Sequence, residues 1–276
     1  MQNAGIAALG LDWRYTAFEV HPDHLAAAIA GAKAMRFIGL NLTLPHKLLA
    51  VGMVDELDAS AKMWGAVNTI RFEALDGAGQ WVPLSDAGTD DCATVRAHGF
   101  NTDADAIARA LHEDLHFRAS GARVLVLGAG GAGRTAALKL ASDGVAELFI
   151  VNRTASKAEE IAAEIRQRFP QTTVATGYPL GPVDLLLHAT SLGLEAGDAF
   201  PLDKARFAIT RARAVYDVIY RPAETALLRT AKTSGCRVAN GLGMLLHQGA
   251  RALEIWASRP APVEAMRKAL KEELYG

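Results

Sequence analysis

A glycine-rich turn lies within the stretch RVLVLGAGGAGRTAALKLA. It carries Gly128, Gly130 and Gly133 in the spacing G-x-G-x-x-G, directly after an apolar strand-like segment and directly before a helical one. The first glycine permits a tight turn, the second lets the backbone approach a pyrophosphate, and the third lets the helix pack on the strand. This context predicts a dinucleotide-binding site. The alternative is a glycine-rich turn in an ordinary α/β protein.

The residues that follow the next apolar segment, FIVNRTASKA, bear on which dinucleotide binds. An NAD site usually has an acid there, about twenty residues after the glycines, which accepts from the ribose 2′-hydroxyl. Asn152, Arg153 and Thr154 stand there instead, and Arg153 with Lys157 can neutralise a 2′-phosphate. We therefore expect NADP rather than NAD. Asn152 and Thr154 could also cap the following helix.

A second candidate for chemistry is GLNLTLPHK, residues 39–47, an apolar run that reads as a strand and ends in Pro45, His46 and Lys47. One explanation is structural: Pro45 begins a helix, where its missing N–H costs nothing, and Lys47 is solvated. The other is functional, with the strand delivering an ammonium group to a cleft. This stretch alone favours the structural explanation.

Length and composition narrow the class of protein. The 276 residues suffice for two domains. The formal charge is −1, and acidic and basic residues are mixed along the chain, so the sequence has no concentration of positive charge that would bind nucleic acid. The apolar runs are too short for a membrane span, so we expect a soluble, cytoplasmic protein without a membrane partner. Cys92 and Cys236 lack a metal-ligand spacing and fit a reducing compartment, so we expect no structural metal.

The first hundred residues alternate short strand-like runs with helical ones. The segment 74–94, rich in Gly, Asp and Ser, is too long for a tight hairpin and is interpreted as a surface insertion. A helix is expected at 21–35, and strands are expected at 13–20, 37–43, 66–73 and 95–102.

From Asp103 the pattern becomes a regular alternation of strands and helices. Helices are expected at 103–119, after Gly133 and at 155–168, and strands at 123–128, 147–152, 172–177, 184–190 and 214–220. Two further helices, 243–257 and 261–274, follow the segment CRVAN. Uninterrupted apolar strands separated by helices imply a parallel sheet covered on both faces. The predicted fold class is therefore α/β, with an N-terminal α/β domain and a Rossmann-type, doubly wound dinucleotide-binding domain.

Seven motifs together resemble the shikimate dehydrogenase family, which reduces 3-dehydroshikimate to shikimate with NADPH, over nearly the whole chain. NLTLPHK is similar to the family's Asn-Val-Thr-x-Pro-x-Lys, GAVNTI to its Gly-Ala-Val-Asn-Thr, and GFNTD to its Gly-x-Asn-Thr-Asp. The glycine turn with NRT, then HATSLG, DVIY and GLGMLLHQGARALEIW, follow in the family's order.

The resemblance implies a role for each motif. Lys47 becomes the general acid and base that gives a proton to, or takes it from, the reacting oxygen, and Asp103 is its expected partner. It also implies four substrate contacts: Thr43, Asn68, Tyr220 and Gln248. Each has a structural alternative, since Asn68 could only tie two strands and Gln248 could only be a polar helix residue. The cofactor would be held by Gly128, Ala129, Gly130, Gly131, Gly133, Asn152, Arg153, Thr154, Lys157, Thr190 and Gly241.

Three departures from the family pattern concern specificity. The family usually begins with a strand followed by Ser-x-Ser-Pro, whose hydroxyls anchor the substrate carboxylate, whereas this sequence starts at MQNAG. We expect the natural protein to extend upstream of Met1. The alternative is a variant that holds the carboxylate by other groups or binds a substrate without one. His188 replaces the usual Asn of Asn-Ala-Thr-Ser, and Ala104 with Ala106 replace common glycines. His46 and His247 occupy positions that the family leaves variable and are interpreted as structural.

The resulting hypothesis is an NADP-dependent shikimate dehydrogenase of aromatic amino acid biosynthesis, a monomer or homodimer with a shikimate-like cyclic polyol carboxylate as substrate. A substrate domain, 1–103 plus 244–276, and an NADP domain, 104–243, are expected around a cleft. The alternatives are a quinate or aminoshikimate dehydrogenase and a non-catalytic NADP-binding protein.

Overall fold

The computed structural model describes residues 1–87, 94–195 and 197–276, and the chain divides into two compact units. The first unit comprises residues 1–103 and 248–273, and the second comprises residues 104–247 and 274–276. Each unit is organised around its own sheet. No helix within the described part of the chain is both long and apolar enough to cross a membrane.

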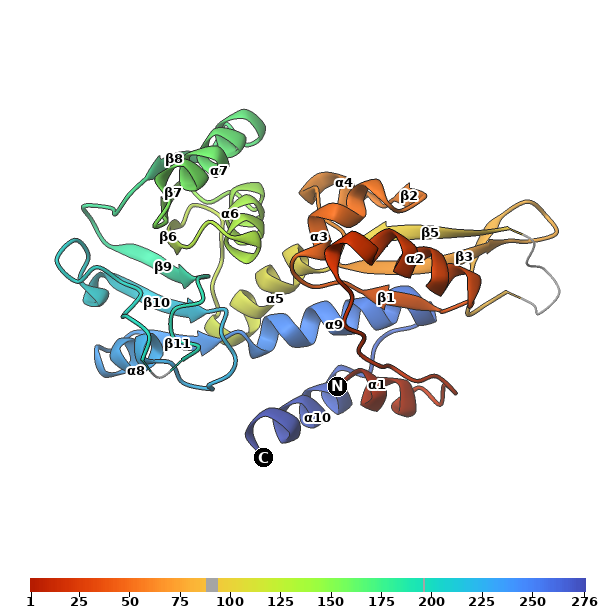
Figure 1. Cartoon of the computed structure of the whole chain (residues 1–276). Coiled ribbons are helices and arrows are strands. Elements are labelled where there is room, and N and C mark those ends of the chain that lie inside the picture. The colour runs from red at the N-terminus through yellow and green to blue at the C-terminus, as the bar shows by residue number, and fades with distance from the viewer. Residues whose placement is uncertain (88–93, 196) are drawn as a thin grey trace. The chain divides into compact units, whose positions relative to one another are not determined.

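A five-stranded mixed sheet forms the centre of the first unit (Figure 1). Its central strand β3 is antiparallel to β1, β4 and β5, and β2 is parallel to β5. Alternate residues of β3, such as Ile70 and Phe72, enter a core that also takes Leu25 and Ile29 of α2. The strands are β1 (Gly39–Asn41), β2 (Glu56–Leu57), β3 (Thr69–Leu75), β4 (Trp81–Pro83) and β5 (Val95–Phe100).

The helices of the first unit are mostly short. Helix α1 packs closely on later segments, because a Cβ atom on Gly5 would lie 2.7 Å from Leu253 and 2.9 Å from Met266. Asp58 caps α4 by accepting from the backbone N–H of Ser60. The helices that lie in or enter this unit are α1 (Gln2–Ala8), α2 (Leu25–Ala34), α3 (His46–Leu49), α4 (Ala59–Trp64), α9 (Leu242–Ala257) and α10 (Val263–Tyr275).

Two predictions for this unit are wrong. The stretch 13–20 forms no strand: most of it is exposed, and the backbone N–H of Tyr15 donates to the side chain of Asn3 instead of to a neighbouring strand. The segment 74–94 is not simply an insertion, since Trp81–Pro83 pairs with β3 across a turn in which the Asp76 carboxylate accepts from two backbone N–H groups. Residues 88–93, with Cys92, lie outside the described residues.

The second unit is a Rossmann-type domain with a six-stranded parallel sheet, as predicted. The order β11-β10-β9-β6-β7-β8 places the change in winding direction between β6 and β9 (Figure 1). Ligands of open α/β sheets bind at the carboxyl ends of the strands beside this switch point. The strands are β6 (Arg123–Leu127), β7 (Glu147–Val151), β8 (Thr173–Thr176), β9 (Val183–His188), β10 (Ala212–Asp217) and β11 (Arg237–Asn240).

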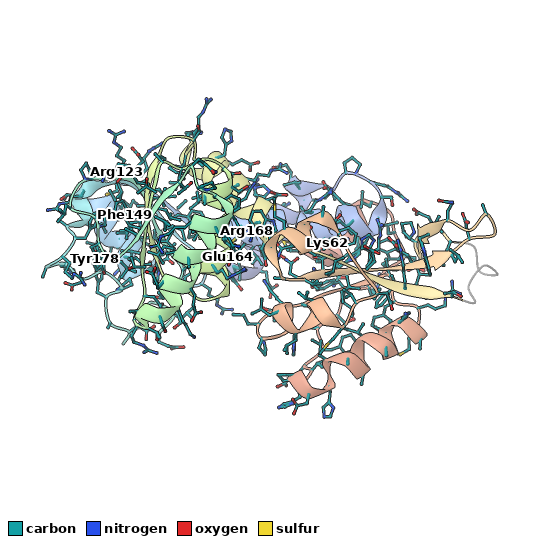
Figure 2. The ribbon with its side chains drawn as sticks, turned by 90° about the horizontal axis from the view of Figure 1, so that it is seen from above. Lys62, Arg123, Phe149, Glu164, Arg168 and Tyr178 are labelled. Carbon is teal, nitrogen blue, oxygen red and sulfur yellow. The ribbon has the colours of Figure 1, made fainter. Side chains whose placement is uncertain are left out.

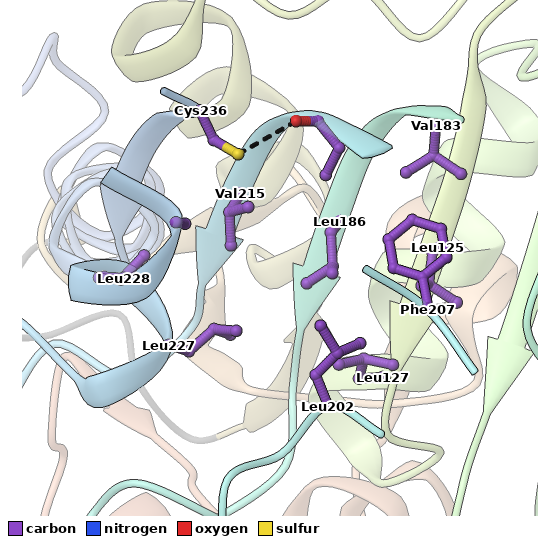
Figure 3. Close-up of a cluster of buried hydrophobic side chains, with 12 residues drawn as sticks. Leu125, Leu127, Val183, Leu186, Leu202, Phe207, Val215, Leu227, Leu228 and Cys236 are labelled. Atoms are coloured by element: carbon purple, nitrogen blue, oxygen red, sulfur yellow. Dashed lines mark hydrogen bonds between the residues drawn. The ribbon is translucent and has the colours of Figure 1, made fainter. Parts of the chain in front are cut away.

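Helix α8, which the sequence analysis did not anticipate, covers part of this sheet. Figure 3 shows Leu227 and Leu228 of α8 beside Leu186 of β9 and Val215 of β10, all in one buried cluster. Cys236 closes the cluster, and its Sγ donates to the carbonyl oxygen of Ala212 at 3.1 Å. The helices are α5 (Asp103–Leu115), α6 (Gly131–Ser142), α7 (Ala155–Arg168) and α8 (Ala226–Thr233).

Charged side chains form cation–π contacts and ion pairs on the surface of the second unit. Arg123 at the start of β6 lies over the ring of Phe149 on β7, 5.7 Å from its centroid, and Arg168 pairs with Glu164 along α7 at 2.6 Å (Figure 2).

Some element boundaries in the second unit differ from those predicted. Helix α5 ends at Leu115 rather than at 119, and β9 ends at His188, so Thr190 lies in the loop that follows.

Candidate active site

Lys47 and Asp103 form an ion pair in the first unit. Nζ of Lys47 lies 2.7 Å from Oδ2 of Asp103, and the two side chains are 26% and 9% exposed. Strand β1 ends at Asn41, and Lys47 lies in the short helix α3, whose N-cap is Pro45. The lysine therefore does not end a strand, and Pro45 does begin a helix. Lys47 is nevertheless paired rather than merely solvated, with part of its surface accessible to a ligand.

The chain between β5 and α5 fixes the Asp103 end of this pair. The Asn101 side chain accepts from the backbone N–H of Asp103 at 3.1 Å and donates to the carbonyl of Ala66 at 3.1 Å. The Asn68 amide accepts from the backbone N–H of Thr102 at 2.8 Å and donates to its hydroxyl at 3.0 Å. Asn68 is 1% exposed and does tie β3 to this turn. Asp103 is also the first residue of α5, where the helix dipole favours a negative charge.

A chain of polar side chains continues from Asn68 across the sheet. The Asn68 Oδ1 atom accepts from the hydroxyl of Thr69, which accepts from Nδ2 of Asn41 at 3.0 Å. Oδ1 of Asn41 then accepts from the hydroxyl of Tyr15 at 3.1 Å. The ordinary pKa of a phenol is about 10, so the Tyr15 hydroxyl is a donor at neutral pH. These bonds give the residues around the ion pair fixed orientations.

The glycine turn of the second unit has the geometry that its spacing predicts. Gly128 adopts a φ of +113°, which L side chains rarely reach, and its N–H donates to the carbonyl of Val151. A Cβ atom on Gly133 would lie 2.1 Å from the carbonyl oxygen of Gly128, so only glycine lets α6 approach the strand. Nothing lies within 4 Å of the corresponding position on Gly130, which leaves room for a ligand there. Ala129 and Gly131 complete the turn between β6 and α6.

The end of β7 lies beside this turn. The Asn152 side chain accepts from the backbone N–H of Ala129 at 3.1 Å and donates to the carbonyl of Thr154 at 2.9 Å. Thr154 is the N-cap residue of α7, but its side chain makes no capping hydrogen bond. Arg153 and Lys157 are exposed, and neither forms an ion pair with any residue that the structure describes. Two unpaired cations therefore lie where a 2′-phosphate is expected.

The loops after β9, β10 and β11 complete the carboxyl edge of the sheet. A Cβ atom on Gly128 would lie 2.5 Å from the carbonyl oxygen of Ala189 and 3.0 Å from Cγ2 of Thr190. The glycine turn after β6 and the loop after β9 are therefore in contact at the switch point. A Cβ atom on Gly241 would lie 2.0 Å from the carbonyl oxygen of Val218, so close approach again requires glycine. Tyr220 follows β10, and its carbonyl accepts from the hydroxyl of Tyr275.

Family models match three segments of the chain. Residues 1–70 match the shikimate dehydrogenase substrate binding domain, 109–191 match shikimate/quinate 5-dehydrogenase, and 241–271 match the shikimate 5′-dehydrogenase C-terminal domain. A shikimate dehydrogenase (NADP⁺) of Methanopyrus kandleri is 37% identical over 99% of this chain and 90% of its own length. The chain belongs to the shikimate dehydrogenase family.

Solved structures of this fold include two that differ in substrate. The shikimate dehydrogenase of Thermus thermophilus, in complex with NADP(H) and shikimate, has a TM-score of 0.79 and 32% identity over 99% of this chain and 92% of that chain. The 5-ketofructose reductase of Gluconobacter sp. strain CHM43 has the same TM-score and coverage, with 35% identity. Similarity to this chain thus extends to a reductase whose named substrate differs from shikimate.

The structure brings together some of the residues that family resemblance singled out. Lys47 and Asp103 are paired in the first unit, and Asn68 is bonded to Thr102, the residue before Asp103. This unit also contains exposed Thr43 and half-buried Gln248 on α9. The glycine turn, Asn152 and Thr190 lie along one sheet edge in the second unit, which also contains Tyr220. His247 is 3% exposed, and its Nε2 lies 2.9 Å from Glu113, as suits a structural residue; His46 is half-buried beside Lys47.

Several residues that organise these sites were not singled out from the sequence. Asn101 and Thr102 belong to the motif GFNTD, and their side chains hold the turn before Asp103. His188 was noted only as a departure from the family pattern, and Asp217 only as part of DVIY. The hydrogen bonds of these two residues depend on strand register, which the sequence does not reveal.

Proposed function

We propose that this chain catalyses the reversible, NADP-dependent reduction of 3-dehydroshikimate to shikimate. The observation that carries the proposal is the partly accessible ion pair between Lys47 and Asp103 in a member of the shikimate dehydrogenase family. Reduction of a carbonyl requires a proton at the oxygen as well as a hydride at the carbon. A paired ammonium that still has accessible surface is suited to deliver that proton.

Each member of the pair has a separate task. Lys47 donates a proton to the carbonyl oxygen as negative charge develops there, and it takes the proton back in the oxidative direction. Asp103 holds the ammonium in position, and its carboxylate also accepts from a substrate hydroxyl. Bound NADPH supplies the hydride. Thr43, Asn68, Tyr220 and Gln248 are the proposed contacts to the hydroxyl groups of the ring.

The dinucleotide is proposed to bind along the carboxyl edge of the sheet in the second unit. The turn of Gly128, Ala129, Gly130, Gly131 and Gly133 would hold the pyrophosphate, with Thr190 and Gly241 nearer the nicotinamide. Asn152 and Thr154 would border the adenosine ribose. Arg153 and Lys157 would neutralise the 2′-phosphate, which supports NADP over NAD. The proposed division of labour is substrate binding by 1–103 plus 244–276 and cofactor binding by 104–243.

A second candidate is a reductase of a different polyhydroxy ketone. The likeness to the Gluconobacter 5-ketofructose reductase, at 35% identity, favours a substrate without a carboxylate. The match to the shikimate/quinate family model favours quinate as a third substrate class. All three share the chemistry assigned to Lys47 and Asp103, because each reaction interconverts a ketone and a secondary alcohol.

Steady-state kinetics with shikimate, quinate and fructose, each with NADP⁺ and NAD⁺, distinguish these candidates. We expect the highest kcat/KM for shikimate with NADP⁺. A higher kcat/KM for fructose would show that the substrate is a neutral ketose, and a higher kcat/KM for quinate would show that the chain is a quinate dehydrogenase. If NADP⁺ binds but none of the three substrates is oxidised, the result would favour a non-catalytic NADP-binding protein.

A further inference from the structure

A buried hydrogen-bond relay connects the ends of β9 and β10 in the second unit. His188 and Asp217, the last residues of these strands, are both 0% exposed, and Nδ1 of His188 lies 2.9 Å from Oδ1 of Asp217. On its other side, Nε2 of His188 lies 2.6 Å from Oγ1 of Thr190. The Asp217 carboxylate also accepts from the backbone N–H of Ile219 and from the hydroxyl of Thr225, at 3.1 Å and 2.7 Å.

When His188 is a neutral imidazole, one arrangement of hydrogens satisfies every partner of this relay. A carboxylate can only accept, so Nδ1 of His188 carries a hydrogen and donates to Asp217. In the neutral imidazole, Nε2 is then an acceptor, and the Thr190 hydroxyl must donate its only hydrogen to it. One lone pair of the Thr190 oxygen accepts from the backbone N–H of Leu192 at 3.1 Å. The remaining lone pair is left for another group.

The Thr190 end of the relay lies at the switch point of the sheet. Strands β6 and β9 are neighbours there, and the loop of Ala189 and Thr190 is in contact with Gly128 of the glycine turn. Strand β10 bears Asp217 on the other side of β9. The Thr190 hydroxyl donates its hydrogen to His188, so at this place the side chain can only accept a further hydrogen bond.

We propose that His188, held by Asp217, is a positioning residue that makes Thr190 a hydrogen-bond acceptor only, and that Thr190 binds a donor group of the dinucleotide. The group is a ribose hydroxyl or the N–H of the carboxamide, and a phosphate oxygen is excluded because it has no hydrogen to give. This inference rests on the proposed binding of NADP. Without His188 the Thr190 hydroxyl could rotate and donate its hydrogen elsewhere, and Thr190 would no longer act as an acceptor only.

The relay itself can be tested on the protein without cofactor. Long-range ¹H–¹⁵N spectra of the uniformly labelled protein report which nitrogen of each histidine carries hydrogen. We expect the His188 ring to be neutral and protonated at Nδ1, with an Nε2 resonance that moves in Thr190→Val and so identifies it. Protonation at Nε2 alone, or at both nitrogens at neutral pH, would overturn the proposal, whatever the enzyme's substrate.

Cofactor affinity then tests what the relay does. Kd values for NADP⁺ are measured by calorimetry for the wild type, Thr190→Val, His188→Leu and the double variant. We expect Thr190→Val to bind about 3- to 10-fold more weakly, the range of one net hydrogen bond. His188→Leu, which can neither accept from Thr190 nor donate to Asp217, should weaken NADP⁺ binding when Thr190 is present but have no further effect in the Thr190→Val background. Thr172→Val, which removes a buried hydroxyl bonded to Val145 at 2.9 Å, is the matched control and should bind normally.

The outcomes separate the inference from the proposed function. The 3-acetylpyridine analogue of NADP⁺ lacks the carboxamide N–H: if Thr190→Val weakens NADP⁺ but not the analogue, the donor is the carboxamide, and equal losses point to a ribose hydroxyl. Unchanged or tighter binding in His188→Leu would overturn the inference, as would equal losses from this substitution in both backgrounds. A wild type that does not bind NADP⁺ would instead refute the proposed function.

Discussion

Nζ of Lys47 lies 2.7 Å from Oδ2 of Asp103, although 56 positions separate the two residues in the sequence. The lysine lies on a helix of only four residues, and the aspartate begins a helix of 13 residues. Bonds from Asn101 and Asn68 hold the aspartate's turn in place. The pair therefore depends on the packing of the first unit and provides the proton-transfer group of the proposed reaction.

Asp103→Asn should lower kcat while the Kd for NADP⁺ stays within about twofold. The amide keeps the shape of the side chain but removes the charge that holds the ammonium, and general acid–base catalysis typically contributes about 10²- to 10⁴-fold. We expect a loss within that range in steady-state assays. Glu56→Gln disrupts the surface pair with Lys62, at 3.1 Å, and serves as the control that should leave kcat unchanged. A fully active Asp103→Asn enzyme would remove Asp103 from the mechanism.

Arg153→Ala should weaken NADP⁺ binding much more than NAD⁺ binding, because only NADP⁺ carries the 2′-phosphate. A charge-assisted hydrogen bond contributes about 1.5 to 3 kcal/mol, which corresponds to a loss of about 10- to 100-fold in affinity. The measurement is the Kd for each cofactor. Arg166→Ala removes another exposed arginine of the same region, paired with Glu159, and should change neither value. Equal losses for both cofactors in Arg153→Ala would show that this residue is structural.

Two glycine substitutions should separate folding from cofactor binding. Gly133→Ala places a methyl group 2.1 Å from the backbone of Gly128, so we expect a destabilisation of about 1 to 3 kcal/mol and a lower Tm. Gly130→Ala meets no protein atom within 4 Å, so the Tm should stay near that of the wild type while NADP⁺ binds more weakly. Thermal unfolding and calorimetry measure the two effects. An unchanged Tm in Gly133→Ala would contradict the packing described here.

Acid should destabilise the first unit through Glu73. Burial raises the pKa of this carboxyl, but hydrogen bonds from His98, Arg71 and Arg96 outweigh it and lower the pKa to about 2. A lowered folded-state pKa contributes stability that is complete above the ordinary value of 4.5 and is lost as the pH falls towards 2. The contribution is on the order of 3 kcal/mol.

Urea unfolding at several pH values measures this contribution. The free energy of unfolding of the wild type should fall between about pH 5 and pH 2, and Glu73→Gln should be less stable at pH 6 and show a smaller fall. Glu272→Gln, at an exposed carboxylate, is the control and should follow the wild type. A Glu73→Gln protein with the full acid dependence would show that other carboxylates are responsible.

The second unit was predicted more accurately than the first, for a physical reason. Its strands are buried on both faces and alternate with helices, so apolar runs such as those of β6 and β9 identify them directly. In the first unit, residues 13–20 have the composition of a strand but no neighbour that pairs with them. Trp81–Pro83 was assigned to an insertion because its pairing with β3 depends on the turn that precedes it.

Residue types indicated the candidate sites, but the sequence could not supply their contacts. The glycine spacing predicted the turn at Gly128 because local geometry alone requires it. The partnership of Lys47 with Asp103 came from family resemblance, since no local pattern joins residues so far apart. The bond between His188 and Asp217 requires the parallel register of β9 and β10, in which these two residues are direct neighbours.

Lys47 is proposed to transfer the proton in a reaction whose cofactor binds elsewhere on the chain. The most direct measurement compares kcat for shikimate oxidation and the Kd for NADP⁺ in the wild type, Lys47→Ala and Lys62→Ala, the last at a surface lysine of the same unit. We expect Lys47→Ala to lower kcat by about 10²-fold or more with little change in the Kd, and Lys62→Ala to change neither. A Lys47→Ala enzyme with the kcat of the wild type would show that Lys47 does not transfer the proton.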